Sequence, residues 1–502
     1  MFRLLFALSS AVRAYPKPDL PISYVILSPG GVPWARSVVA LSEDCPQLQA
    51  KVGYEGLLEH AGTPRPRAVG DSQMPYRFPV KVCEVRLPSE IPQGSLLFGR
   101  ELPAISKSPV HTLLVGDTGL RVKAENDGTC VDPGPEKLYG IKQCKPEDII
   151  PFDASLVAGT FQNLSKWPLK EQMDAAAAST PDLVIHVGDY FYRQGPCPQN
   201  QPCTAINDPF NPRMPGAWGD NWNGWYADFF APSMRLLSQA PWIALRGNHE
   251  RCGRGGAGYF LFLDPRSYPE VTAGHYCADY TSPYAVPFAT EQFLVLDTAM
   301  VDSLHFDDEC PEGQQEQVFP LSPMEDPDLA GAEEEILKNV QVYREKFRQI
   351  AELKRDDVTN IFLSHHPIYA IRCHAGRYRS AQWTLQQALL KDTLEGISAS
   401  FHGHVHWFQA MEYPKLTHVV VGNGGTLLLN TSGKQPRGRF ELVLPAGNLS
   451  TEAYSKSVFG FGQLLTSHHS YAFNAIERGR GSMWSGHFGA DLGRFLQAPV
   501  LI

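Results

Sequence analysis

The stretch VIHVGDYFYRQ, residues 184–194, predicts a buried strand that runs into an aromatic loop. Val184, Ile185 and Val187 favour a strand because they are β-branched, and the Gly-Asp pair that follows ends the apolar run. Tyr192 comes three residues after Asp189. A Gly-Asp pair is more often a simple turn than a ligand. Its meaning therefore depends on what the other predicted strands carry at their ends.

Six further apolar runs predict strands, and most of them also end in residue types that bind metal ions. The runs are residues 111–117, 241–250, 291–299, 360–367, 398–406 and 417–425, and helical patterns at 169–179, 331–356 and 380–392 alternate with them. This alternation predicts an α/β core. Because ligands collect beyond the carboxyl ends of such strands, the side chains there can hold two divalent or trivalent ions. Besides Asp189, they are Asp117, Asn248, His249, His365, His366, His402, His404 and His406.

Length and composition describe an ordinary globular protein. The chain has 502 residues, 43% of them hydrophobic and 19% charged, so it can bury a large core. Its net charge of −9 argues against nucleic acid as a partner, since a nucleic-acid-binding protein needs a basic surface to neutralise phosphates. A small anionic substrate is still compatible, because a bound metal ion reverses the charge locally. Apart from the N-terminus, no run is long and apolar enough to span a membrane.

The cysteines and the N-terminus predict an oxidising compartment. Ten cysteines is an even number, and several lie in polar, proline-rich loops such as GPCPQNQPCTA, residues 195–205. Disulfides make better sense there than free buried thiols. Residues 1–16 look like a short secretory signal peptide, with a frayed apolar terminus as the alternative. We therefore expect a secreted or periplasmic protein.

Changes in the sequence pattern divide the rest of the chain into three parts. Residues 17–107 are rich in proline and in short alternating runs, which predicts a small N-terminal β-rich domain. Residues 108–435 have the α/β pattern and contain all the strand ends described above. Residues 436–502 are β-like and glycine-rich, and we expect them to complete the core with further strands.

In order along the chain, the strand ends read GD, GD, GNHE, HHP and GHVH, and these blocks resemble the calcineurin-like metallophosphoesterase superfamily. The resemblance implies a four-layer α/β/β/α sandwich, in which residues 108–435 are the catalytic domain. Many members carry Asp-x-His in the first block, where this chain has Gly119. Purple acid phosphatases similarly lack that histidine and carry GDxxY in the second block. Their tyrosine, which binds iron, corresponds to Tyr192.

The resemblance also implies the metal ligands. It assigns one ion to Asp117, Asp189, Tyr192 and His406, and the other to Asp189, Asn248, His365 and His404. A tyrosine bound as phenolate at low or neutral pH needs a strongly acidic ion, because the pKa of a free tyrosine is near 10. The expected cofactors are thus two metal ions, Fe(III) plus Zn, Fe or Mn. Alternatively, the loop keeps the tyrosine away from the metal and leaves a site for zinc, manganese or ferrous iron.

The implied activity is that of an acid phosphatase, which hydrolyses phosphate monoesters by attack of a metal-bound hydroxide. His249 and His374 would bind phosphate oxygens or protonate the leaving group, and the partner would be a small phosphorylated substrate. The same metal site could instead serve a phosphodiesterase or a nucleotide phosphohydrolase. A secreted binding protein without turnover would be expected to have lost His249 or a ligand.

Residues around the blocks leave two interpretations open. The aromatic stretch 218–230 can line a substrate cleft or form an amphipathic helix buried against the core. Arg246 and Arg251 can contact phosphate, or they can lie on the surface or behind the ligands. Asp297 can brace a ligand or cap a turn, and His366 can lie behind the ligands or on the surface.

Overall fold

The structure is a computed structural model, and it describes the parts of the chain that contain all seven predicted strands. The described residues are 20–45, 48–52, 57–62, 65–66, 78–88, 95–97, 100–120, 167–192, 220–266, 277–301, 317–323, 331–374, 376–390, 392–429, 435–445, 447–467 and 470–489. The possible signal peptide lies outside these ranges.

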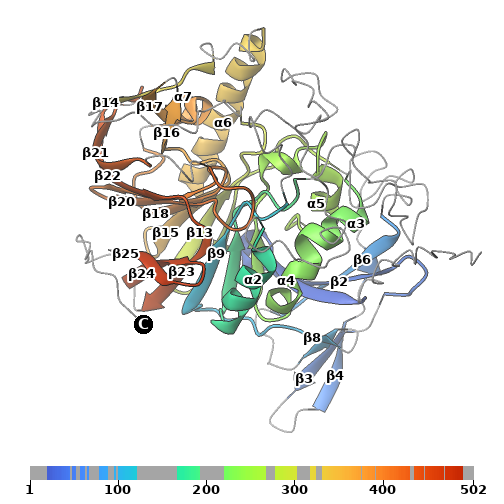
Figure 1. The fold of residues 1–502 in the computed structure, drawn as a ribbon. Coiled ribbons are helices and arrows are strands. Elements are labelled where there is room, and N and C mark those ends of the chain that lie inside the picture. The colour runs from blue at the N-terminus through green and yellow to red at the C-terminus, as the bar shows by residue number, and fades with distance from the viewer. Residues whose placement is uncertain are drawn as a thin grey trace, which may run out of the picture.

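Two large sheets form the centre of the molecule (Figure 1). The first has ten strands in the order β25-β24-β23-β9-β10-β11-β1-β2-β6-β5. Three of the predicted strands, β9, β10 and β11, are parallel neighbours in its middle. The strands are β1 Ile22–Leu27, β2 Pro33–Ala40, β5 Arg65–Pro66, β6 Val80–Arg86, β9 His111–Val115, β10 Leu183–His186, β11 Trp242–Ala244, β23 Gly460–Ser467, β24 Ser470–Glu477 and β25 Gly481–Gly489.

The second sheet has eleven strands in the order β12-β13-β15-β18-β20-β19-β22-β21-β14-β17-β16. The other four predicted strands, β13, β15, β18 and β20, are parallel neighbours within it. Its strands are β12 Tyr284–Pro287, β13 Glu291–Leu296, β14 Gln317–Pro320, β15 Thr359–Ser364, β16 Ala370–His374, β17 Arg377–Ala381, β18 Ile397–His402, β19 Phe408–Tyr413, β20 Leu416–Val421, β21 Arg437–Leu442 and β22 Leu449–Lys456. A separate four-stranded sheet contains β3 Leu48–Val52, β4 Leu57–Gly62, β7 Leu96–Leu97 and β8 Arg100–Glu101.

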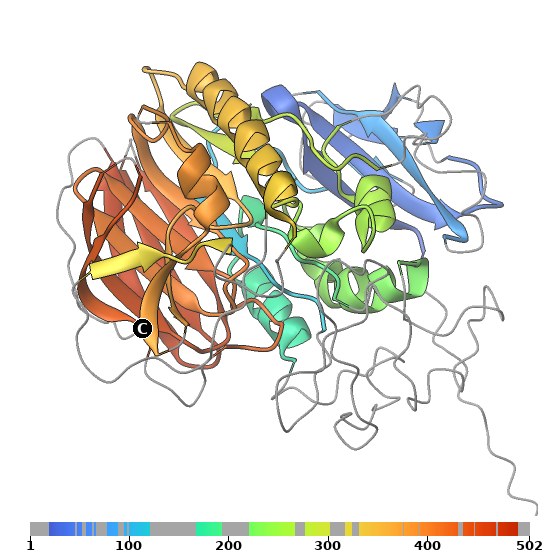
Figure 2. The same ribbon diagram turned by 90° about the horizontal axis from the view of Figure 1, so that it is seen from above.

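Helices cover the outer face of each large sheet, as the view from above shows (Figure 2). The first sheet packs against α2 Leu169–Ala178, α3 Trp222–Trp225, the π-helical turn η4 Tyr226–Phe230, α4 Ala231–Leu237 and α5 Gly256–Phe262. The second packs against α6 Glu333–Leu353 and α7 Trp383–Ala388. Two 3-10 turns, η1 Pro29–Gly31 and η5 Asn248–Glu250, complete the helical elements described. The expected α/β/β/α sandwich, with strands in the N-terminal part of the chain, is therefore confirmed.

The central strands are apolar throughout because both of their faces are buried. Val184 of β10 packs in the cluster under the helices, whereas its neighbours Leu183 and Ile185 pack between the two sheets. In the same way, Leu113 faces the helices and Leu114 faces the opposite sheet. Successive side chains of a strand point to opposite faces, so a strand between two layers needs an unbroken apolar run.

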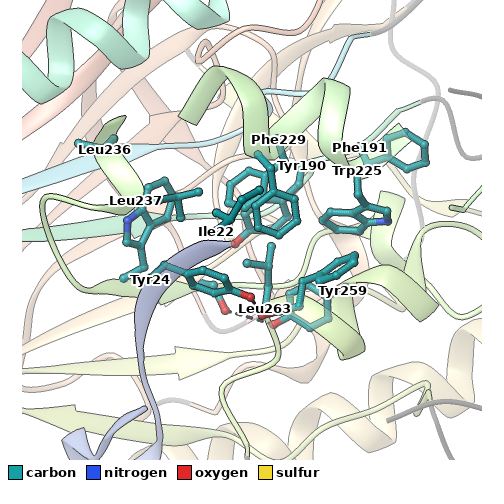
Figure 3. Close-up of a cluster of buried hydrophobic side chains, with 14 of the residues drawn as sticks. Ile22, Tyr24, Tyr190, Phe191, Trp225, Phe229, Leu236, Leu237, Tyr259 and Leu263 are labelled. Atoms are coloured by element: carbon teal, nitrogen blue, oxygen red, sulfur yellow. Dashed lines mark hydrogen bonds between the residues drawn. The ribbon is translucent and has the colours of Figure 1, made fainter. Parts of the chain in front are cut away.

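The aromatic stretch before the third block forms part of the core under the helices (Figure 3). Trp222, Trp225, Phe229 and Phe230 are fully buried, and the Phe229 ring packs edge-on against Tyr190 at a centroid distance of 5.2 Å. The described part of this stretch therefore packs the interior, as the amphipathic-helix alternative predicts. Residues 218 and 219 lie outside the described ranges.

Segments from both ends of the chain are built into the first sheet. Strand β1 pairs in parallel with β11, with Ile26 opposite Trp242, and β2, β6 and β5 continue the sheet outward. On the other side, β23 pairs antiparallel with β9. The predicted boundary at residue 107 therefore does not coincide with the edge of a sheet. Such pairings between distant segments have no local sequence signal, and the division of the chain into domains stays a prediction.

Disulfides occur among the described cysteines, as expected for an oxidising compartment. Cys45 is bonded to Cys83, Cys252 is bonded to Cys277, and Cys373 is also disulfide-bonded. The other cysteines lie outside the described residues. Within the described ranges, no helix has both the length and the apolar character that crossing a membrane requires.

The interior of the second sheet contains two adjacent neutral histidines. His418 on β20 is fully buried, its Nδ1 is 2.7 Å from the Ser400 hydroxyl, and its ring lies 4.2 Å from that of His402. Burial lowers the pKa of His418 to about 3, although a backbone hydrogen bond with Tyr369 acts in the opposite direction. The folded protein therefore keeps this imidazole uncharged.

We expect His418 to make the protein less stable in acid. In the unfolded chain the pKa of this imidazole is near 6.5. Its contribution to the free energy of unfolding is therefore complete above that pH and is lost as the pH falls toward about 3. Between pH 7 and 5.5, wild type should lose about 1 kcal/mol more free energy of unfolding than His418→Gln. Urea unfolding of the metal-free proteins at both pH values measures this difference, and equal losses in the two proteins would contradict it.

Candidate metal centre

Seven predicted ligands come together where the two large sheets meet. The first sheet supplies Asp117 after β9, Asp189 after β10 and Asn248 after β11. The second supplies His365 after β15, and His404 and His406 after β18. Tyr192 follows in the loop after Asp189. The carboxyl ends of parallel strands therefore gather these side chains, as the sequence predicts.

Three of the candidate ligands have a left-handed backbone conformation. Asp117, Asp189 and His404 have φ angles of 56°, 61° and 69°, and Thr180 is the only other described non-glycine residue with positive φ. This conformation is uncommon for residues with a Cβ, although aspartate and histidine adopt it more readily than most. Its concentration at the strand ends indicates that the local chain path serves a site.

The Tyr192 hydroxyl lies at the centre of the first group of ligand atoms. It is 3.0 Å from Asp117 Oδ1, 3.0 Å from Asp189 Oδ2 and 3.0 Å from His406 Nε2. His406 Nε2 also lies 3.3 Å from Asp117 Oδ1. A phenol has one proton and cannot donate to both carboxylates at once. A cation bound by all four side chains would satisfy this crowded set of oxygen and nitrogen atoms.

A second group of ligand atoms shares Asp189 with the first. Asn248 Oδ1 is 3.1 Å from His365 Nε2 and 3.0 Å from His404 Nδ1. His365 Nε2 lies 3.2 Å from Asp189 Oδ2, the oxygen that also contacts Tyr192. Ligand atoms of Asp117, Asp189 and His365 all lie within 4.8 Å of one another. The residues therefore fit two ions that share one carboxylate.

Backbone carbonyls orient two of the imidazoles. His365 Nδ1 is 2.8 Å from the oxygen of Val187, and His406 Nδ1 is 2.9 Å from the oxygen of Leu427. A carbonyl oxygen only accepts, so each Nδ1 donates its proton, and each Nε2, once it carries no proton, can offer a lone pair to a metal ion.

Electrostatic interactions at the centre favour an ionised Asp189. Burial opposes its charge, but His365 and His249 hold its pKa well below the usual range. Burial likewise opposes protonation of His365, yet the Asp189 carboxylate raises its pKa to about 9. Burial, together with the charge of His365, lowers the pKa of His404 well below its usual value. The buried carboxylate thus depends on a neighbouring positive charge.

Gly119 has no room for the histidine that many calcineurin-like proteins carry at this place in the first block. A Cβ there would lie 2.7 Å from the oxygen of Tyr190 and 2.9 Å from Cα of Phe191. The backbone that leads into Tyr192 occupies this space. Tyr190 itself is buried against His186, with ring centroids 3.8 Å apart, so it packs in the core.

The two predicted catalytic histidines lie on different elements. The backbone N–H of His249 donates to Asp189 Oδ1 at 2.9 Å, and its ring lies 4.0 Å from the ring of Tyr192. His374 is the last residue of β16. Phosphate binding by His374 stays a prediction.

Glu250 has a structural role that sequence reasoning missed. Its buried carboxylate accepts hydrogen bonds from the backbone N–H groups of Asp189, Tyr190, Phe191 and Gly247, at 2.9, 2.8, 3.3 and 2.9 Å. Burial, with the charge of Asp189 adding to it, raises the pKa of Glu250 to about 8. Glu250 therefore ties the loop after β10 to the loop after β11. In the sequence, the only signal for this role was the position of Glu250 as the last residue of the GNHE block.

His366 is buried behind the ligands, so the surface alternative is wrong. Its backbone N–H donates to the Thr298 hydroxyl at 2.9 Å, and its ring lies 4.0 Å from that of His404. Ligand atoms of His365, His366 and His404 lie within 4.8 Å of one another, so His366 is an additional nitrogen at the second group. His402 is also fully buried, and its Nδ1 lies 2.9 Å from the Ser364 hydroxyl.

The two arginines that flank GNHE are buried and bind protein groups. Arg246 pairs with Asp297 at 2.8 Å and donates to two backbone oxygens. Arg251 donates to the backbone oxygens of Ala299 and Val301, each at 2.6 Å. Asp297 also accepts from the N–H of Ala299, which caps a turn. These contacts favour the alternative that places both arginines behind the ligands.

Comparison with known proteins identifies the family. The model of the calcineurin-like phosphoesterase family matches residues 111–408. Among solved structures, PhoD has a TM-score of 0.47 at 10% identity, over 95% of this chain and 90% of that one. GAP50, titled the anchor in the inner membrane complex of Plasmodium, has a TM-score of 0.36 at 12% identity, over 77% and 90%. No curated protein sequence matches the chain.

The family match covers more than half of the 502 residues and includes every candidate ligand from Asp117 to His406. This chain therefore belongs to the calcineurin-like phosphoesterase family.

Proposed function

We propose that the protein is a dinuclear-metal phosphatase of the acid phosphatase type that hydrolyses phosphate monoesters. Its family implies a metal-dependent hydrolase of phosphoesters. The observation that carries the finer proposal is the position of the Tyr192 hydroxyl, 3.0 Å from two carboxylates and from one imidazole. This resembles the tyrosine of purple acid phosphatases, where the phenol oxygen binds iron.

The ligand residues divide between two ions. Asp117, Asp189, Tyr192 and His406 would hold Fe(III), and Asp189, Asn248, His365 and His404 would hold Zn, Fe or Mn. A phenolate ligand favours ferric iron, because a weaker Lewis acid would leave the phenol protonated at acidic pH. Two such ions, when bound, supply a nucleophile from water and stabilise the charge of the phosphoryl group.

The protein residues would position the substrate and handle protons. His249 is fixed to Asp189 through its backbone N–H, and its imidazole lies against Tyr192, so it can contact a phosphate held at the centre. We assign it to bind a phosphate oxygen or protonate the leaving alkoxide. His374 has the same proposed task. Glu250 accepts hydrogen bonds from the N–H groups of Asp189 and Gly247, and so would hold the loop after β10 and the loop after β11 in the positions that substrate binding requires.

We also propose that the protein works outside the cytoplasm. The Cys45–Cys83 and Cys252–Cys277 disulfides support this location, since such bonds persist in oxidising compartments.

Replacing Tyr192 should abolish the visible colour of the iron-loaded protein. If its phenol oxygen binds ferric iron, wild type has a tyrosinate-to-iron charge-transfer band that Tyr192→Phe lacks. Tyr190→Phe is the matched control, because this neighbouring tyrosine packs in the core. Absorption spectra with metal analysis of all three proteins measure the effect. A colourless wild type that contains ferric iron would refute the Tyr192 ligand, and a more generic dinuclear phosphoesterase would remain.

His249→Gln should slow monoester hydrolysis without loss of metal. General acid catalysis contributes about 10²–10⁴-fold, so we expect kcat for 4-nitrophenyl phosphate at acidic pH to fall by about that factor. His111→Gln, at the opposite end of β9 from Asp117, is the control. Removal of the metals from wild type with a chelator should abolish turnover. A holoprotein that prefers diesters or nucleotides to monoesters would replace the proposal with a phosphodiesterase or nucleotide phosphohydrolase.

A further inference from the structure

His366 brings a nitrogen to the second group of ligand atoms that the ligand set proposed above does not use. One nitrogen each of His365, His366 and His404 lie within 4.8 Å of one another. Two nitrogens bound to one zinc ion are at most about 4.2 Å apart, because each lies about 2.1 Å from the metal. The three imidazoles are therefore close to the spacing that a shared ion requires.

The distances between the three rings lead to the same conclusion. The centroid of the His365 ring lies 5.1 Å from that of His366 and 5.4 Å from that of His404. Imidazoles that bind one tetrahedral ion have centroids about 5 Å apart, since each nitrogen is about 2.1 Å from the metal. The rings of His366 and His404 are closer, at 4.0 Å, so this pair has to open slightly around an ion.

Hydrogen bonds fix His366 through its backbone and through Nδ1. Its N–H donates to the Thr298 hydroxyl at 2.9 Å, its carbonyl oxygen accepts from the Ser364 hydroxyl at 2.7 Å, and its Nδ1 lies 3.2 Å from the Thr298 hydroxyl. The Nε2 atom is buried and has no hydrogen-bond partner among the described residues. A buried polar atom without a partner is unfavourable, and a metal ion bound to Nε2 would satisfy it.

Two other buried histidines show that such a nitrogen alone does not indicate a ligand. His402 and His418 also have an Nε2 without a partner in the described part of the chain. Neither of them belongs to a group of candidate ligand atoms within the ranges that the structure describes. His366 combines the partnerless nitrogen with two neighbouring candidate ligands. One of these, His404, is partly exposed, so an ion can reach the group from solvent.

A third imidazole changes which metal ion the second group favours. Asp189 and Asn248 offer oxygen atoms, so together with His365 and His404 they form a group of two oxygens and two nitrogens. Imidazole nitrogen suits zinc, whereas carboxylate and carbonyl oxygens suit manganese. With His366 included, nitrogen becomes the majority donor.

We propose that His366 is a further ligand of the second metal ion and makes this position selective for zinc over manganese. Its Nε2 would bind the ion while the Thr298 hydroxyl holds Nδ1, in the way that backbone carbonyls hold the Nδ1 atoms of His365 and His406. This inference rests on the dinuclear centre proposed above, and it names the second metal of that centre.

The test compares His366→Gln and His366→Phe with the full-length wild type. His418→Gln is the matched control, because it removes another buried imidazole whose Nε2 has no partner among the described residues. Each protein is loaded with iron first and then titrated with zinc or manganese against a chromophoric chelator, which gives both affinities. X-ray absorption at the zinc edge counts the imidazoles bound to zinc, and circular dichroism verifies that each variant is folded.

We expect His366→Gln to weaken zinc binding by about 100-fold or more, because loss of a residue that only supports a ligand already costs about 10–100-fold. Manganese affinity should fall by about tenfold or less, since glutamine offers a carbonyl oxygen that suits manganese. The zinc spectrum should lose one imidazole relative to wild type. His366→Phe should lose the same imidazole, and the control should resemble wild type in every measurement.

Equal numbers of imidazoles in wild type and His366→Gln would overturn the inference, and so would equal losses of zinc and manganese affinity. A residue that only supports His404 would give these results. Failure of the proposed function looks different, because none of these measurements depends on turnover. A wild type that hydrolyses no phosphate ester refutes the phosphatase, and the zinc spectra still decide whether His366 is a ligand.

Discussion

The centre depends on two carboxylates that are buried side by side. Asp117 and Asp189 are 0% and 1% exposed, and both lie 3.0 Å from the Tyr192 hydroxyl. Removing two like charges from water is unfavourable unless positive charge lies close to them. The left-handed backbone at both aspartates and the Glu250 contacts maintain this arrangement. A pair of cations bound there would neutralise the charge of the carboxylates. Binding them would be the function that the strained backbone at both aspartates serves.

The arrangement of the sheets explains why the ligands can meet. The first sheet contributes carboxylates and an amide at the ends of β9, β10 and β11, and the second contributes imidazoles at the ends of β15 and β18. Neither sheet alone supplies all the candidate ligands of either metal ion. The apolar layer between the sheets, which includes Leu114, Ile185 and Phe401, therefore fixes the distance between the two halves of the centre. Core packing and ligand geometry are coupled for this reason.

The sequence allowed prediction of the central strands and of the place where the candidate ligands gather, because most of these residues directly follow a recognisable apolar run. It could not reveal Glu250 as a clamp, since its four N–H partners belong to two separate loops. The pairing of β1 with β11 was also hidden, since residues so far apart in the chain share no local pattern.

The pairing of β23 with β9 has a consequence for biosynthesis. The chain emerges from the ribosome from its N-terminus, and Gly460–Ser467 follows His111–Val115 by more than three hundred residues. The strand that ends before Asp117 therefore keeps one open hydrogen-bonding edge for most of translation. Long-range pairing of this kind folds slowly and leaves strand edges exposed to other chains meanwhile. The nascent chain thus needs protection from aggregation until its late strands have been made.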